Sequence, residues 1–273
     1  MSAYARPTRL DDALALRALG GCNVLAGGTD HYPGRVGRRP QENILDLTAL
    51  AALRGIRQTG ECWRIGATST WSDVIEARLP PLFDCLKLAA REVGGLQIQN
   101  AGTLAGNLCN ASPAADGVPA LLALDACVEL ASASGRRTLP LAQFVLGPRR
   151  TALRDDEIVA AILVPRPAHE ARSHFLKLGA RKYLVISIAM AAAVIEHDNG
   201  IVRAARVAVG ACSPVARRLP ALEASLLGRR VDAGLVRAEH FAHLAPLDDV
   251  RASAGYRTQA ALVLVRRLLE ALA

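Results

Sequence analysis

The pattern of hydrophobic and polar positions changes at Pro165–Arg166–Pro167. Two prolines in three residues interrupt both helix and strand hydrogen bonding, so we expect a linker there. Asn199–Gly200, further on, is a strong hairpin signal. We therefore expect an α+β chain with an N-terminal domain at residues 1–167 and a smaller C-terminal domain at 168–273. In the C-terminal domain, the apolar positions predict three strands and then two helices, over residues 173–178, 186–196, 202–210, 219–227 and 257–272.

The part before the linker divides into two subdomains, at about 1–54 and 55–167. The sequence of the first subdomain predicts an amphipathic helix over 7–19 with Thr8 as its N-cap. Strands at 23–26 and 43–47 follow, separated by a connection rich in Gly and Arg. The second subdomain predicts a loop at 94–117, which is rich in Gly, Asn, Ala and Ser. It also predicts a hairpin at 56–59 and 62–67, strands of the same sheet at 127–131, 138–140 and 158–164, and helices at 71–77, 82–92 and 118–124.

Composition narrows the classes of function. The chain has 273 residues, of which 51% are hydrophobic and 21% charged, and this excludes a disordered polyampholyte. The formal net charge of +8 is compatible with nucleic acid or with an acidic cofactor. The basic residues are scattered singly or in pairs, and no aromatic residues interleave with them. We therefore expect no nucleic-acid partner.

The spacing of the cysteines and the length of the apolar stretches indicate whether the chain binds a metal and where in the cell it is found. The six cysteines form no C-x-x-C motif and have no tight zinc or iron–sulfur spacing; they are Cys22, Cys62, Cys85, Cys109, Cys127 and Cys212. The first nine residues lack the apolar region of a signal peptide. The longest uncharged apolar stretch, 184–195, is too short to span a bilayer. We expect no metal site, no membrane span, and a cytoplasmic protein with reduced thiols.

Two loops are candidates for ligand binding. The first, Leu25–Ala26–Gly27–Gly28–Thr29–Asp30, directly follows a predicted strand, and its adjacent glycines can present successive N–H groups to a pyrophosphate. On that motif alone, an ordinary Gly–Gly turn is the favoured interpretation. The second, residues 97–116, places Asn, Thr, Ser and Asp among small residues, immediately before an apolar helix. It suits the wall of a site for a long polar ligand, although a solvated loop stays open. Neither loop matches G-x-G-x-x-G or the P-loop.

Nothing in the chain forms a catalytic constellation. The six histidines show no H-E-x-x-H, and there is no G-x-S-x-G. Lys177 is of interest because it lies alone in the apolar strand Phe175–Leu178. It is either a surface lysine or the charge partner of an anionic ligand.

At these loops the sequence resembles the FAD-binding (medium) subunits of the molybdenum hydroxylases, the carbon monoxide dehydrogenase and xanthine dehydrogenase type. The resemblance extends over essentially the whole chain. It is carried by Leu25–Asp30, Thr103–Leu104–Ala105–Gly106–Asn107, Asn110–Ala111–Ser112–Pro113–Ala114–Ala115–Asp116, Pro119–Ala126, Arg206–Pro214 and Tyr256–Leu268.

The resemblance implies a two-part FAD domain of the vanillyl-alcohol-oxidase type, followed by a C-terminal domain of the carbon monoxide dehydrogenase flavoprotein type. It implies that the two loops hold the FAD pyrophosphate, that Asp116 helps to hold the adenosine side, and that Lys177 lies near the flavin. The residues expected to bind FAD are Val24, Leu25, Ala26, Gly27, Gly28, Thr29, Asp30, His31, Asn100, Thr103, Leu104, Ala105, Gly106, Asn107, Asp116 and Lys177.

The sequence departs from the family pattern at three positions. Ala105 replaces a Gly of the T-x-G-G-N pattern, Gln99 stands where many relatives have Arg, and Val185 where many have Asp. An Ala at position 105 requires a negative φ or a phosphate that lies slightly further away. The three changes bear on the redox tuning of the flavin and on the electron acceptor.

The function implied is electron transfer. FAD would receive electrons from iron–sulfur centres on a separate small subunit and pass them to NAD or another acceptor, with molybdopterin on a separate large subunit. Two alternatives stay open at this stage. One is a stand-alone flavin oxidoreductase of the same fold, and the other is an assembly subunit that has lost FAD. The sequence does not reveal the substrate of the complex, its acceptor or its stoichiometry.

Overall fold

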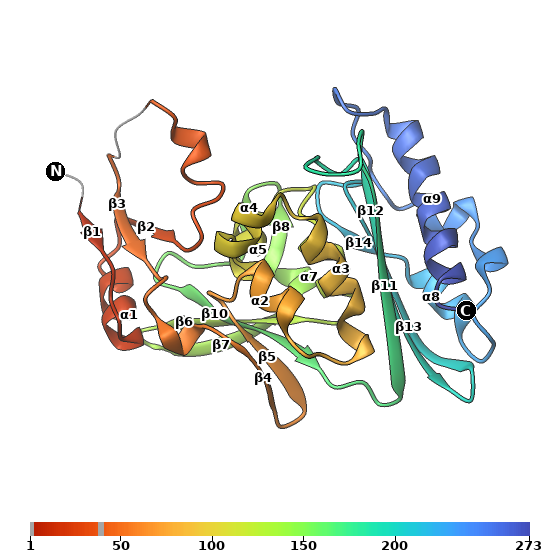
Figure 1. The fold of residues 1–273 in the computed structure, drawn as a ribbon, viewed down its shortest axis with the longest axis horizontal. Helices are drawn as coiled ribbons and strands as arrows, with labels where there is room; N and C mark the ends of the chain where they lie inside the picture. Colours follow the sequence, from red (N-terminus) through yellow and green to blue (C-terminus); the bar gives the residue numbers. More distant parts are fainter. Residues whose placement is uncertain (1–2, 38–40) are drawn as a thin grey trace.

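Three main sheets follow one another along the chain (Figure 1), in a computed structural model that describes residues 3–37 and 41–273. The N-terminal lobe lies at one end of the molecule and the C-terminal sheet with its helices at the other. Residues 38–40, part of the expected Gly/Arg-rich connection, lie outside the described residues. The candidate site depends on how the first two sheets meet.

The N-terminal lobe is a small parallel sheet with one helix. Its strands β1 (Tyr4–Ala5), β3 (Asn43–Asp46) and β2 (Cys22–Leu25) are adjacent in that order. Helix α1 (Leu10–Ala18) packs Ala13 and Leu14 against Leu45. Thr8 is not the N-cap as expected, because the helix begins one residue later and Arg9 holds the cap position without a side-chain bond. Short 3₁₀ helices η1 (Pro33–Arg35) and η2 (Ala51–Leu53) complete the lobe.

The second sheet is antiparallel and has five strands. The order is β4 (Ile56–Thr59), β5 (Cys62–Gly66), β10 (Ile158–Pro165), β6 (Cys127–Ser132) and β7 (Gly135–Pro140). The predicted hairpin and the predicted membership of one sheet are both confirmed. A separate two-stranded ribbon pairs β8 (Val145–Gly147) with β9 (Arg150–Thr151).

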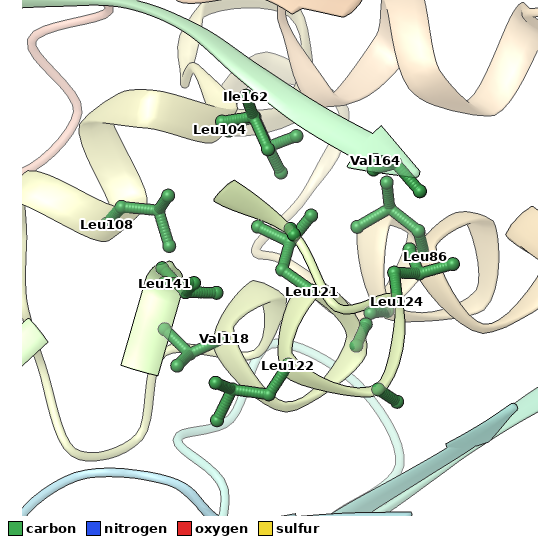
Figure 2. Packing of buried hydrophobic residues seen from close by; sticks show 14 of the residues in the cluster. Leu86, Leu104, Leu108, Val118, Leu121, Leu122, Leu124, Leu141, Ile162 and Val164 are labelled. Carbon is green, nitrogen blue, oxygen red and sulfur yellow. The ribbon is translucent and has the colours of Figure 1, made fainter. Parts of the chain in front are cut away.

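A group of short helices lies over this sheet (Figure 1). The prediction of a loop at 94–117 is wrong, because the chain there forms α4 (Leu96–Ala101) and α5 (Leu104–Asn110). Helices this short depend on tertiary packing rather than on intrinsic propensity. Leu104 and Leu108 of α5 are fully buried in the cluster that Figure 2 shows. The other elements are α2 (Trp71–Glu76), η3 (Pro81–Phe83), α3 (Asp84–Glu92), α6 (Gly117–Ala123) and α7 (Leu141–Phe144).

The third sheet is antiparallel, in the order β11 (Glu170–Leu178), β12 (Ala189–Asp198), β13 (Ile201–Gly210) and β14 (Arg217–Arg218). Asn199 and Gly200 form the predicted hairpin turn with φ of 51° and 78°. Two positive φ values are the mark of the type I′ turn, whose twist matches that of the strands. The last elements are α8 (Pro220–Leu226), η4 (Ala233–Leu235), η5 (Ala238–Phe241) and α9 (Ala254–Glu270).

Strand β12 is buried on both faces. Ala191 and Ala193 face the cluster that contains α8 and α9, whereas Met190, Ala192 and Val194 belong to the large cluster with Leu86 and Leu121. Small side chains on both faces allow helices to approach the strand from either side. One hydrophobic core therefore extends from the five-stranded sheet to the C-terminal sheet.

Candidate functional site

A cleft of about 760 Å³ separates the N-terminal lobe from the helices over the five-stranded sheet. This volume lies within the usual range of cofactor sites, about 300–1,000 Å³. Twelve of the sixteen residues expected to bind FAD line it. They are Val24, Leu25, Ala26, Gly27, Gly28, Thr29, Asp30, His31, Thr103, Ala105, Gly106 and Asn107.

The first wall of the cleft is the loop that follows β2. Gly27 packs directly on the backbone of the second wall, because a Cβ at this position would overlap the carbonyl oxygen of Ala101 and lie 2.8 Å from the Cα of Gly102. Gly28 has a φ of +70°, a conformation that side chains other than glycine rarely adopt. The two loops predicted separately from the sequence are thus in contact, and glycine at position 27 permits that contact.

The loop presents a row of free amide groups. The N–H groups of Gly27, Gly28, Thr29, Asp30 and His31 meet no hydrogen-bond acceptor among residues 3–37 and 41–273. Successive free N–H groups at a strand end form a concavity that binds anions. The turn that the Tyr32 N–H closes on the Gly28 carbonyl leaves the amides of Thr29, Asp30 and His31 without an internal acceptor.

The second wall is fixed by α2 and the start of α5. The N–H of Trp71 donates to the Gly102 carbonyl at 3.1 Å, and the N–H of Leu104 donates to the Ser69 carbonyl at 3.1 Å. Thr103 caps α5 by accepting the N–H of Gly106 at 3.0 Å. Ala105 has no positive φ, so its methyl group fits the helical backbone without strain.

Two buried polar atoms among the residues that line the cleft lack a hydrogen-bond partner. Thr68 Oγ1 and Asn107 Oδ1 are both enclosed, and neither finds a hydrogen-bond partner in the part of the chain that the structure describes. Leaving such a group unpaired costs about 1–3 kcal/mol. Sites with unpaired buried groups are typical of ligand pockets, because the ligand supplies the missing bond.

The charge of the cleft is positive. Among the described lining residues the charged side chains are Arg17, Arg35, Arg149 and Asp30. Arg149 donates from Nη1 to Asp30 Oδ2 at 2.8 Å and to Asn110 Oδ1. Arg149 and Arg17 could not be predicted from the sequence, because scattered arginines carry no positional signal. Thr68 and Trp71 were also missed, although the predicted helix start at 71 placed them beside a cap.

The other four expected residues lie outside the lining. Asn100 is exposed and accepts a hydrogen bond from Ser72, and Leu104 is buried in the core. Asp116 and Lys177 form a buried ion pair with 2.8 Å between Oδ2 and Nζ. Lys177 is therefore neither a surface lysine nor an isolated cation.

The pair nevertheless lies next to the cleft wall. Lys177 Nζ also donates to the carbonyl of Glu92, which precedes the lining residue Val93. Gly117, which follows Asp116, is close enough that a Cβ on it would lie 3.0 Å from Asn107 Oδ1. Burial raises the pKa of Asp116, and Lys177 and Ser187 oppose that rise.

Comparison with known proteins identifies the family of the chain. Residues 1–167 match the family model described as the FAD binding domain in molybdopterin dehydrogenase, and residues 174–272 match the carbon monoxide dehydrogenase flavoprotein C-terminal domain. The chain belongs to the FAD-binding subunits of the molybdenum hydroxylases. It is a subunit of an oxidoreductase, and its cofactor is FAD.

Individual relatives agree with this assignment. The carbon monoxide dehydrogenase medium chain of Hydrogenophaga pseudoflava is 32% identical, over 98% of this chain and 96% of that one. A putative xanthine dehydrogenase FAD-binding subunit of Escherichia coli is 34% identical, over 78% of this chain and 75% of its own length. The solved carbon monoxide dehydrogenase of H. pseudoflava superposes with a TM-score of 0.89 at 31% identity, covering 99% of this chain and 96% of that chain.

The described residues add two plain observations about this FAD-binding subunit. They include no helix that is both long and apolar enough to cross a membrane. Nor do they bring three or more His, Cys, Asp or Glu side chains together as a metal site. The free N–H groups and the arginines of the described cleft suit the binding of an anionic group.

Proposed function

We propose that FAD binds in the cleft between the N-terminal lobe and α5, held by the twelve lining residues that the sequence predicted. The observation that carries the proposal is the coincidence of free N–H groups with two unpaired buried polar atoms on facing walls. When bound, FAD supplies the redox chemistry, accepting electrons from one partner and delivering them to another. The chain supplies binding, orientation and electrostatics.

The two kinds of group suit different parts of the cofactor. Free N–H groups at Gly27 to His31 and at Ala105 are donors, so they match pyrophosphate oxygens, which only accept. Asn107 Oδ1 is an acceptor, so it requires a hydroxyl or an N–H of the cofactor and does not suit a phosphate. Arg17 adds positive charge to the lining of the cleft. Leu104, Asp116 and Lys177 are buried behind these walls, whereas Asn100 is exposed outside the cleft.

We propose that the electrons come from iron–sulfur clusters on a small subunit, and that molybdopterin is carried by a large subunit. The support is that carbon monoxide dehydrogenase relatives are named medium chains and that this chain matches them over nearly its full length. NAD is one acceptor consistent with this role. The division into domains at 1–167 and 168–273 is supported by the ranges of the two family models. The further division of the first domain near residue 54 is supported by its two separate sheets. The six free cysteines favour the cytoplasm.

A one-methyl change tests the cleft directly. Gly27→Ala places a Cβ against the Ala101 carbonyl, which forces the two walls apart. Gly255→Ala is the matched control, since it adds the same methyl group outside the lining of the cleft with nothing within 4 Å. We expect the FAD dissociation constant of the apoprotein, measured by calorimetry, to rise at least tenfold for Gly27→Ala and to stay unchanged for Gly255→Ala. Equal FAD affinity in both variants would show that the cofactor lies elsewhere.

Purification from the native source tests the partners. The proposal expects the chain to elute with iron–sulfur and molybdopterin chains and to carry flavin absorbance. A chain that elutes alone with FAD and oxidises or reduces a substrate by itself is the stand-alone flavoenzyme instead. A chain that elutes without flavin, and does not bind added FAD, is an assembly subunit.

A further inference from the structure

Two parts of the cleft are linked by a single arginine. Among the described residues, Arg149 makes the one hydrogen bond or ion pair between the segment at 26–37 and the residues beyond 54. The guanidinium Nη1 contacts Asp30 of the first wall and Asn110 at the end of α5. The two walls also meet by close packing, where Gly27 lies against Ala101 and Gly102 and where Thr29 lies beside Gly102.

The backbone at Arg149 is held in an unusual conformation. Its φ is 57°, in the left-handed region that residues other than glycine seldom adopt. Its N–H donates to the Ala111 carbonyl at 3.0 Å, and Ala111 is itself a left-handed residue that ends α5. The side chain is thus directed across the cleft from a fixed point in the turn between β8 and β9. Such strain persists only where the surrounding structure enforces it.

We propose that Arg149 is a positioning residue that closes the cleft over bound FAD by joining its two walls, and so sets the rate at which FAD is lost. This inference rests on the proposed site for FAD. The bridge, which is the ion pair between Arg149 and Asp30, is exposed, with side-chain exposures of 61% for Arg149 and 59% for Asp30. An exposed ion pair has a modest effect on stability, so the fold does not depend on it. The bridge matters because it must open for the walls to separate.

The experiment measures FAD dissociation from the holoprotein by flavin fluorescence, with a competing apoflavoprotein as the trap. For Arg149→Met we expect about a fivefold faster release, the factor that corresponds to about 1 kcal/mol. Arg150→Met is the matched control, because Arg150 is the adjacent exposed arginine and forms no ion pair in the described chain. Arg149→Lys should restore part of the slow release.

Asp30→Asn separates closure from direct contact with the cofactor. If Arg149 acts through Asp30, Asp30→Asn also speeds release, and the double variant is no faster than either single one. If Arg149 acts only on the FAD phosphates, removing the Asp30 charge leaves the arginine free and slows release. That result, or an unchanged rate for Arg149→Met, would overturn the proposal. A wrong FAD site would instead appear as unaltered FAD affinity in Gly27→Ala.

Discussion

Asp116 and Lys177 form a buried ion pair that joins α6 to β11, with 2.8 Å between Oδ2 and Nζ. Only 5% of the Lys177 side chain and 10% of the Asp116 side chain is exposed. Ser187 donates a second bond to the same carboxylate at 2.5 Å from the far side of the loop between β11 and β12. One carboxylate of the FAD-binding part thus holds both ends of a loop of the C-terminal part.

This pair is expected to act mainly on stability. Lys177→Met removes the cation and leaves the Asp116 carboxylate buried with Ser187 as its remaining side-chain partner. Breaking a buried pair in this way typically costs about 3–5 kcal/mol, because the remaining charge is desolvated without compensation. We expect a loss of that size in the free energy of unfolding from urea denaturation of the apoprotein.

The control for this prediction is Lys182→Met, since Lys182 is exposed on the same loop. It should change the free energy of unfolding by less than about 0.5 kcal/mol. The double variant Lys177→Met with Asp116→Leu should recover most of the loss, because neither charge is then left unpaired. Equal stabilities for Lys177→Met and Lys182→Met would mean that the pair contributes nothing to folding.

Much of the fold could be predicted because its signals are local. The continuous apolar run of β12 and the Asn199–Gly200 turn depend on neighbouring residues only. Helices α4 and α5 could not be predicted in the same way. Gly, Asn and Ala between 94 and 117 have the composition of a loop, and their helices form because Thr103 caps α5 and Leu104 and Leu108 enter the core.

In the candidate site, too, some features could be predicted from the sequence and others could not. The glycine loop and the Thr103–Asn107 segment could be recognised by their motifs. Their contact at Gly27 is visible only in the tertiary structure, and it supports the interpretation of both motifs. The partner of Lys177 could not be read from the sequence, since Asp116 lies 61 positions away. Arg149 stayed unnoticed for a similar reason, because its importance comes from contacts with residues distant in sequence.

Asn107→Ala is expected to weaken FAD binding without weakening the apoprotein. Asn107 Oδ1 has no hydrogen-bond partner within the described ranges, so its removal costs no bond in the absence of cofactor. In the holoprotein a lost bond in a buried site is worth about 1–3 kcal/mol, or roughly 5- to 150-fold in affinity. Calorimetric titration of FAD into the variant checks the affinity, and urea denaturation of the apoprotein checks stability.

Asn100→Ala provides the comparison within the same segment. Asn100 was expected from the sequence to bind FAD, but its side chain is exposed outside the cleft and bonds to Ser72. We expect its FAD affinity to equal that of the wild type. If Asn100→Ala weakens binding as much as Asn107→Ala, the lining of the cleft does not describe the cofactor site.

Glu157 provides a prediction on pH. Its carboxylate is buried and accepts bonds from Arg137 at 2.5 and 2.7 Å and from the N–H of Arg154 at 2.9 Å. The bond with Arg137 is the main reason that the pKa of Glu157 lies below its ordinary value of 4.5. An acid with a lowered pKa in the folded state stabilises the fold fully above its unfolded pKa. That contribution disappears as the pH falls through the folded pKa.

Glu157→Gln should therefore flatten the acid side of the stability profile. The variant lacks the titrating group, so between neutral pH and the acid range its free energy of unfolding should fall less steeply than that of the wild type. Asp156→Asn is the control, because Asp156 is the exposed neighbour and its substitution removes the same charge. Urea denaturation at a series of pH values measures the difference. Parallel curves for Glu157→Gln and the wild type below pH 4.5 would show that the bond with Arg137 does not couple this carboxylate to folding.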